Sequence, residues 1–96
     1  DAARGILLGA ERYESLVPVN LGTGVETSIR ETTERIGALC GFKGAIRWDT
    51  GRPNGVARRC LDVSRARDEF GFCATVPLDE GLRRTLDWWR TAGNHP

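Results

Sequence analysis

The sequence of 96 residues predicts the α/β class, as a small α+β domain in which about four helices surround a very small two- or three-stranded sheet. Two observations carry this prediction. Helix start and stop signals recur along the chain, and two short segments of alternating polarity lie between them. A chain this short buries only roughly 60–65% of its unfolded surface. Because no linker is long enough to divide it, one domain is expected.

The first two helices are predicted from their end residues. Asp1 can cap a helix that runs to about Tyr13. Ser28 followed by Glu31 forms a capping box for the second helix, and Gly41 marks its C-terminal end. The apolar residues expected to face the core are Ile6, Leu7, Leu8 and Ala10 in the first helix, and Ile29, Ile36, Leu39 and Cys40 in the second.

Two further helices are predicted in the C-terminal half. Ser64 can cap a short one that runs to about Glu69 and ends at Gly71. The last begins at Pro77, carries acidic residues in its first turn and leaves Trp88 off its apolar stripe. That stripe consists of Leu78, Leu82, Leu86 and Trp89.

The predicted strands are residues 18–21 and 45–48. The first alternates in polarity and runs into a glycine turn at 22–24. The second delivers the chain directly into an arginine-rich loop, an order that suits a ligand-binding loop on a rigid support.

The arginine-rich loop is the strongest functional signal. Residues 51–67 contain five arginines and one acid, although the whole chain is nearly neutral. Guanidinium groups bind phosphates and carboxylates through paired hydrogen bonds, so an anionic ligand held by Arg52 and by Arg58 or Arg59 is predicted. Asn54 and Gly55 tolerate left-handed backbone, which predicts a tightly shaped turn. The alternative is a solvated loop whose arginines pair with Asp49, Asp68 and Glu69.

Composition excludes several classes of function. Fourteen basic residues against thirteen acidic ones give a net charge of +1, which provides no global field for nucleic acid or an anionic membrane. No apolar run approaches the roughly 20 residues of a membrane span. The chain has no Met and begins with Asp1, which predicts a processed product or an excised domain.

No catalytic, metal or cofactor-binding residues are predicted within this chain. Cys40, Cys60 and Cys73 lack paired spacing, so they are expected to be reduced thiols in a cytoplasmic protein without a zinc site. His95, the only histidine, lies at the end of the chain and receives no role. The glycines at 22–24 lack the third glycine of a dinucleotide fingerprint, and Lys43 is in the wrong context for a phosphate loop.

The order of motifs resembles the C-terminal part of the extended short-chain dehydrogenase/reductase family, the NAD(P)-dependent nucleotide-sugar epimerases, dehydratases and reductases. Residues 20–24, NLGTG, followed by 28–31, SIRE, look like the family's strand, turn and helix start. Residues 52–65, RPNGVARRCLDVSR, look like its Lys/Arg-Pro-Asp-Gly-x-Pro-Arg-Arg/Lys-x-Leu-Asp-x-Ser/Thr-Arg signature, and most resemble the GDP-L-fucose synthase branch. Residues 77–82 with the tryptophan pair at 88–89 resemble its final helix.

The resemblance implies that residues 1–96 are the nucleotide-sugar-binding C-terminal domain, with the Rossmann domain and the catalytic residues missing on the N-terminal side. NAD or NADP would be bound by the full-length parent and not by this fragment. Asn54 would contact the sugar or base of a nucleotide-diphosphate sugar, Arg52 would lie beside the diphosphate, and Arg58 and Arg59 would support or touch the same ligand. The family has Asp where this chain has Asn54, and Pro where it has Ala57.

Two other functions remain open at this stage. A polyanion or nucleic-acid binding module could use the arginine-rich loop, although no recognised nucleic-acid motif accompanies it. A purely structural or oligomerisation module is the other alternative, with its apolar surface covered by the missing domain or by a second copy in a homodimer.

Overall fold

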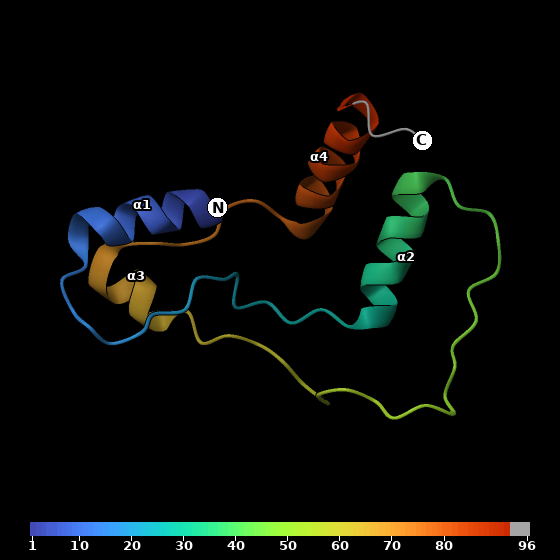
Figure 1. The fold of residues 1–96 in the computed structure, drawn as a ribbon, viewed down its shortest axis with the longest axis horizontal. Helices are drawn as coiled ribbons and strands as arrows, with labels where there is room; N and C mark the ends of the chain where they lie inside the picture. The colour runs from blue at the N-terminus through green and yellow to red at the C-terminus, as the bar shows by residue number, and fades with distance from the viewer. Residues whose placement is uncertain (93–96) are drawn as a thin grey trace. The chain divides into compact units, whose positions relative to one another are not determined.

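The structure is a computed structural model that describes residues 1–92, a range that excludes His95. It contains four helices there: α1 (Ala2–Arg12), α2 (Ile29–Cys40), α3 (Ser64–Phe70) and α4 (Leu78–Thr91) (Figure 1). The chain forms two compact units. Unit 1 comprises Asp1–Glu26 and Arg58–Val76 and contains α1 and α3, whereas the described part of unit 2 comprises residues 27–57 and 77–92 and contains α2 and α4.

The predicted α/β class is wrong, because no residue of the described range 1–92 belongs to a β-strand. Residues 18–21, predicted as a strand, lead into an extended segment that lies alongside residues 58–63 in unit 1. The amide of Asn20 donates to the Asp62 carbonyl at 3.3 Å, and the Cys60 thiol donates to the Gly24 carbonyl at 3.5 Å. Both contacts are made by side chains. The alternating polarity of residues 18–21 therefore corresponds to partly buried, extended backbone and not to a β-ladder of backbone hydrogen bonds.

The second predicted strand, residues 45–48 in unit 2, is also absent. All four of its residues are exposed, although the Arg30 guanidinium lies over the Trp48 ring at 4.6 Å from the ring centroid. The apolar residues Ile46 and Trp48 therefore stand on the surface of unit 2, where the sequence pattern predicted a half-buried strand.

The core of unit 1 is aromatic and small. Its buried hydrophobic residues are Ala66, Phe70 and Phe72. Gly71 lies between the two phenylalanines with a left-handed φ of 72°, and the Phe72 amide donates back to the Ala66 carbonyl at 3.0 Å. This reversal ends α3, as its glycine predicted, and returns the second ring to the core. The partly buried residues packed against this core are Leu8, Tyr13, Val19, Leu21 and Ala74.

Helix α1 packs on this core through a glycine. A Cβ atom at Gly5 would lie 2.9 Å from Leu21 Cδ1 and 3.0 Å from Phe72 Cε2, so only glycine permits this close approach without displacement of a neighbour. Asp1 stands at the N-cap as predicted, but its carboxylate caps nothing in α1 and instead accepts hydrogen bonds from the backbone N–H groups of Thr75 and Val76. The side chains of Ile6 and Leu7, predicted to face the core, are exposed.

Helix α2 confirms the predicted end signals. The Ser28 hydroxyl accepts from the Glu31 backbone N–H at 3.1 Å, and the Glu31 carboxylate accepts from the Ser28 backbone N–H at 2.9 Å. Gly41 ends the helix in the left-handed conformation with φ 67°. The hydrogen bonds that the Glu31 carboxylate accepts from the Ser28 backbone N–H, and then from the Ser28 hydroxyl, lower the pKa of this carboxyl, so the box is complete only while the group is ionised.

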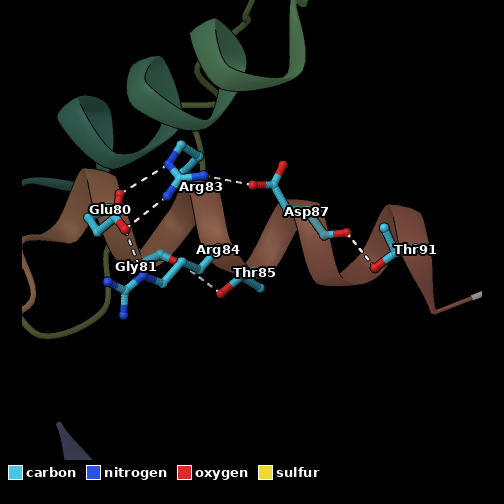
Figure 2. Close-up of polar contacts among 7 residues, drawn as sticks. All are labelled: Glu80, Gly81, Arg83, Arg84, Thr85, Asp87 and Thr91. Atoms are coloured by element: carbon cyan, nitrogen blue, oxygen red, sulfur yellow. Dashed lines mark hydrogen bonds and ion pairs between the residues drawn. The ribbon is translucent and has the colours of Figure 1, made fainter.

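Helix α4 begins after Pro77 as predicted and carries a network of ion pairs along one side (Figure 2). The Glu80 carboxylate accepts from Arg83 at 2.9 Å and from Arg84 at 2.6 Å, and Arg83 also donates to Asp87 at 2.9 Å. Glu80 in the first turn therefore has partners one turn further on, in addition to the favourable helix dipole.

Helices α2 and α4 contact each other within unit 2 without burying a residue. Arg35 of α2 donates to Asp79 of α4 at 2.9 Å, which fixes the first turn of α4 beside α2. Of the predicted stripe, Leu82 and Leu86 are half-buried, whereas Leu78 and Trp89 are exposed, as is Trp88 off the stripe. Among residues 1–92, no helix is both long enough and apolar enough to cross a membrane.

Replacing Phe72 by Ala is expected to unfold unit 1, because loss of a buried aromatic ring costs about 3–5 kcal/mol and a domain of this size has little stability to spare. Phe42→Ala is the matched control, since the Phe42 side chain is exposed in unit 2. Urea unfolding followed by far-UV circular dichroism measures both variants. Equal losses of stability would contradict the assignment of the core to Phe72.

Acidification is expected to weaken α4 through Glu80. Hydrogen bonds from Arg83, and then from Arg84, lower the pKa of Glu80 below its usual value. Its stabilising contribution is therefore complete above the unfolded pKa of about 4.3 and is lost as the pH falls through the lower folded pKa. Glu80→Gln should remove this part of the pH dependence of the thermal midpoint, whereas Glu34→Gln, on exposed α2 surface, should leave it in place. Identical pH profiles for the two variants would exclude this role.

Candidate functional site

The four predicted binding residues divide between the two units. Arg52 and Asn54 belong to unit 2, and Arg58 and Arg59 belong to unit 1. All four residues are exposed.

Arg52 is held by a short turn in unit 2. The Asp49 carboxylate accepts from the Gly51 backbone N–H at 3.1 Å through Oδ1, and from Arg52 Nε at 3.2 Å through Oδ2. One aspartate thus shapes the turn and orients the guanidinium. The Arg52 side chain remains 83% exposed, so its terminal N–H groups face solvent.

Asn54 and Gly55 do not adopt the left-handed backbone that they tolerate. Within residues 1–92 the only positive φ values belong to Gly24, Gly41 and Gly71. The bend occurs earlier, at residues 50–52, because the Asp49 side chain already supplies the hydrogen bond that closes it. Asn54 is exposed and makes no hydrogen bond within the described residues.

Arg58 is paired within unit 1. Its Nε donates to both carboxylate oxygens of Glu26 at 2.8 Å, and 78% of its side chain is exposed. Arg59 differs sharply, because it has no hydrogen bond or ion pair within residues 1–92. Sequence reasoning missed Glu26, which lies 32 positions from its partner and carries no local motif.

The Glu26–Arg58 pair follows from the way residues 20–26 lie against residues 58–63. The Thr23 hydroxyl accepts from the Val25 backbone N–H at 3.1 Å and forms a compact turn. Gly24 adopts φ 70°, and a Cβ there would lie 3.1 Å from Val63 Cγ2. The glycine turn therefore allows the two segments to approach and brings Glu26 opposite Arg58.

A cavity of about 160 Å³ lies at the other end of this contact, lined by Pro18, Asn20, Asp62, Ser64 and Arg65. The Ser64 hydroxyl and backbone N–H bind the Asp62 carboxylate and lower the pKa of this group, with smaller contributions from Arg67 and Arg65. Asp62 therefore supplies the first-turn hydrogen bond of α3 that was predicted for Ser64, and Val63 stands at the N-cap. Arg65 donates to the Pro18 carbonyl at 2.9 Å and so supports the fold.

The alternative of local charge pairing is partly correct. Arg52 pairs with Asp49, and Arg67 pairs with Asp68 at 2.8 Å. Within residues 1–92 no cluster of three or more His, Cys, Asp or Glu side chains is placed to hold a metal ion. All three cysteines are free and exposed.

No protein-family model and no solved structure matches the chain, but curated proteins do. It is 36% identical over 89 residues to a probable GDP-L-fucose synthase 1 of Oryza sativa, an alignment that covers 93% of the chain and 27% of the relative. Identity to the GDP-L-fucose synthase of Escherichia coli is 37% over 71 residues, covering 74% of the chain and 22% of the relative. A putative UDP-glucose 4-epimerase of Methanocaldococcus jannaschii is 36% identical over 90 residues, covering 94% of the chain and 28% of the relative.

The chain thus spans about a quarter of the length of the curated relatives that it matches. The similarity nevertheless extends over almost all of the chain, and the motifs that resemble the family lie within its 96 residues. The chain therefore belongs to the extended short-chain dehydrogenase/reductase family, with GDP-L-fucose synthases and UDP-glucose 4-epimerases among its homologues.

Proposed function

We propose that this chain is the substrate-binding C-terminal domain of a longer nucleotide-sugar epimerase or reductase of the GDP-L-fucose synthase type. The observation that carries the proposal is the 36% identity to a probable GDP-L-fucose synthase across 93% of the chain. In this proposal the longer protein is an NAD- or NADP-dependent enzyme. Its Rossmann domain and catalytic residues lie N-terminal to the residues described above, and this chain contributes binding alone.

The chemistry of the arginines supports binding of a diphosphate. Arg52 and Arg58 each use Nε to bind a carboxylate of their own unit, at 3.2 and 2.8 Å. Their terminal nitrogens make no hydrogen bond within residues 1–92, and the Arg52 and Arg58 side chains are 83% and 78% exposed. A guanidinium held by one edge presents two parallel N–H donors at its end, which match two oxygens of a phosphate.

Asn54 and Arg59 are the other two proposed binding residues, Asn54 next to Arg52 in unit 2 and Arg59 next to Arg58 in unit 1. The Asn54 side chain is exposed and offers one acceptor and two donors for the sugar or base of the nucleotide. Arg59 adds a second positive charge next to Arg58. Pairing of Arg52, Arg58 and Arg67 with carboxylates neutralises much of the local positive charge, which favours a compact anion over an extended polyanion.

Arg52→Ala is expected to weaken GDP binding by roughly 1–3 kcal/mol, the range for loss of a charge-assisted hydrogen bond. Calorimetric titration with GDP, UDP and inorganic phosphate measures this change. Arg47→Ala is the control, because Arg47 is an exposed arginine of unit 2 outside the proposed site. Equal effects of the two substitutions would contradict the role of Arg52. Binding that ignores the base and falls steeply with salt would instead indicate a general polyanion site.

A further inference from the structure

Glu26 and Arg58 form the one ion pair that joins residues 20–26 to residues 58–63 within the described part of unit 1. Both carboxylate oxygens lie 2.8 Å from Arg58 Nε. The exposed fractions differ: 41% for the Glu26 side chain and 78% for the Arg58 side chain. The carboxylate is thus partly covered, whereas the guanidinium reaches outward from it.

The position of Glu26 is fixed by its own segment. The Thr23 turn, the left-handed backbone at Gly24 and the hydrogen bond from the Cys60 thiol to the Gly24 carbonyl all precede it by two or three residues. These contacts tie the backbone that carries the carboxylate to the segment that carries Arg58. An acid on a fixed backbone can orient a long, flexible side chain. A side chain that is already ordered in this way loses less conformational entropy when a ligand binds.

We infer that Glu26 is a positioning residue, whose carboxylate holds the Nε edge of Arg58 so that the two terminal nitrogens face an incoming phosphate. This inference rests on the proposed function of Arg58 and adds a residue that sequence reasoning did not identify. Glu26 does not touch the ligand in this arrangement. It acts through Arg58, although its carboxylate places one negative charge near the bound anion.

Arg59 provides an internal comparison. It is adjacent to Arg58 in sequence and exposed, but it has no partner within residues 1–92. Its guanidinium must therefore be ordered when an anion binds, with a loss of side-chain entropy that Arg58 has already undergone. The two arginines are not equivalent donors, although the sequence presents them as a pair.

The orientation of Arg58 is measured without any ligand by NMR, from the rate at which its Nε proton exchanges with water. The Arg58 proton should exchange more slowly than the Arg59 proton in the unmodified chain, because only the former is hydrogen-bonded. Glu26→Gln should bring the two rates together. Glu69→Gln is the matched control, since Glu69 is an exposed acid of unit 1. Equal rates for Arg58 and Arg59 in the unmodified chain would overturn the inference.

The second measurement is a double-mutant cycle with GDP as the probe. Glu26→Gln should weaken GDP binding about two- to five-fold, the range for an exposed ion pair, and should have no further effect when Arg58 is already Ala. Tighter binding by Glu26→Gln would show that the carboxylate only repels the anion, and would overturn positioning. If Arg58→Ala leaves GDP affinity unchanged while the exchange rates behave as expected, the proposed role of Arg58 fails and the orientation by Glu26 stands. Absence of any GDP binding would refute the proposed function and, with it, the purpose of the positioning.

Discussion

The chain reversal at Gly71 is the constraint on which unit 1 depends. It places Phe70 and Phe72 in one core, although they are separated by a single residue and α3 ends between them. The ring of Phe72 in turn sets how closely α1 approaches, because the contact is made at Gly5. Within residues 1–92, these two rings and Ala66 are the only buried hydrophobic residues, so no second layer there compensates for an error. The extended segment that carries Glu26 continues from Leu21, which packs on the same core.

Much of the helical structure was predictable because helix ends are encoded locally. Ser28 and Glu31 satisfy each other's backbone groups, and Gly41 and Gly71 supply left-handed backbone where no other residue does so cheaply. The sheet was predicted wrongly for the opposite reason. Whether an extended segment forms a ladder depends on its neighbour, and residues 20–26 meet a segment that offers side-chain contacts. Local alternation carries no information about that choice.

The candidate site likewise combines features that the local sequence encodes with contacts that depend on the fold. The arginines themselves are visible in the sequence, and the pairing of Arg52 with Asp49 is a contact three residues apart. The pairing of Arg58 with Glu26 spans 32 positions and depends on the turn at Gly24. Sequence alone therefore made Arg58 and Arg59 interchangeable candidates, and the fold distinguishes them. The two adjacent guanidinium groups differ because, among the described residues, an acid, Glu26, lies opposite Arg58 alone.

The two units are interleaved along the chain, since unit 1 is interrupted by residues 27–57 and resumes at Arg58. During synthesis α1 and Leu21 emerge well before the rings against which they pack. The N-terminal part of unit 1 must therefore remain without its core until Phe72 has left the ribosome. Residues 27–57, which delay this meeting, contain α2 and also carry Arg52 and Asn54, so lengthening this insertion would slow the folding of unit 1 without changing any residue of that core.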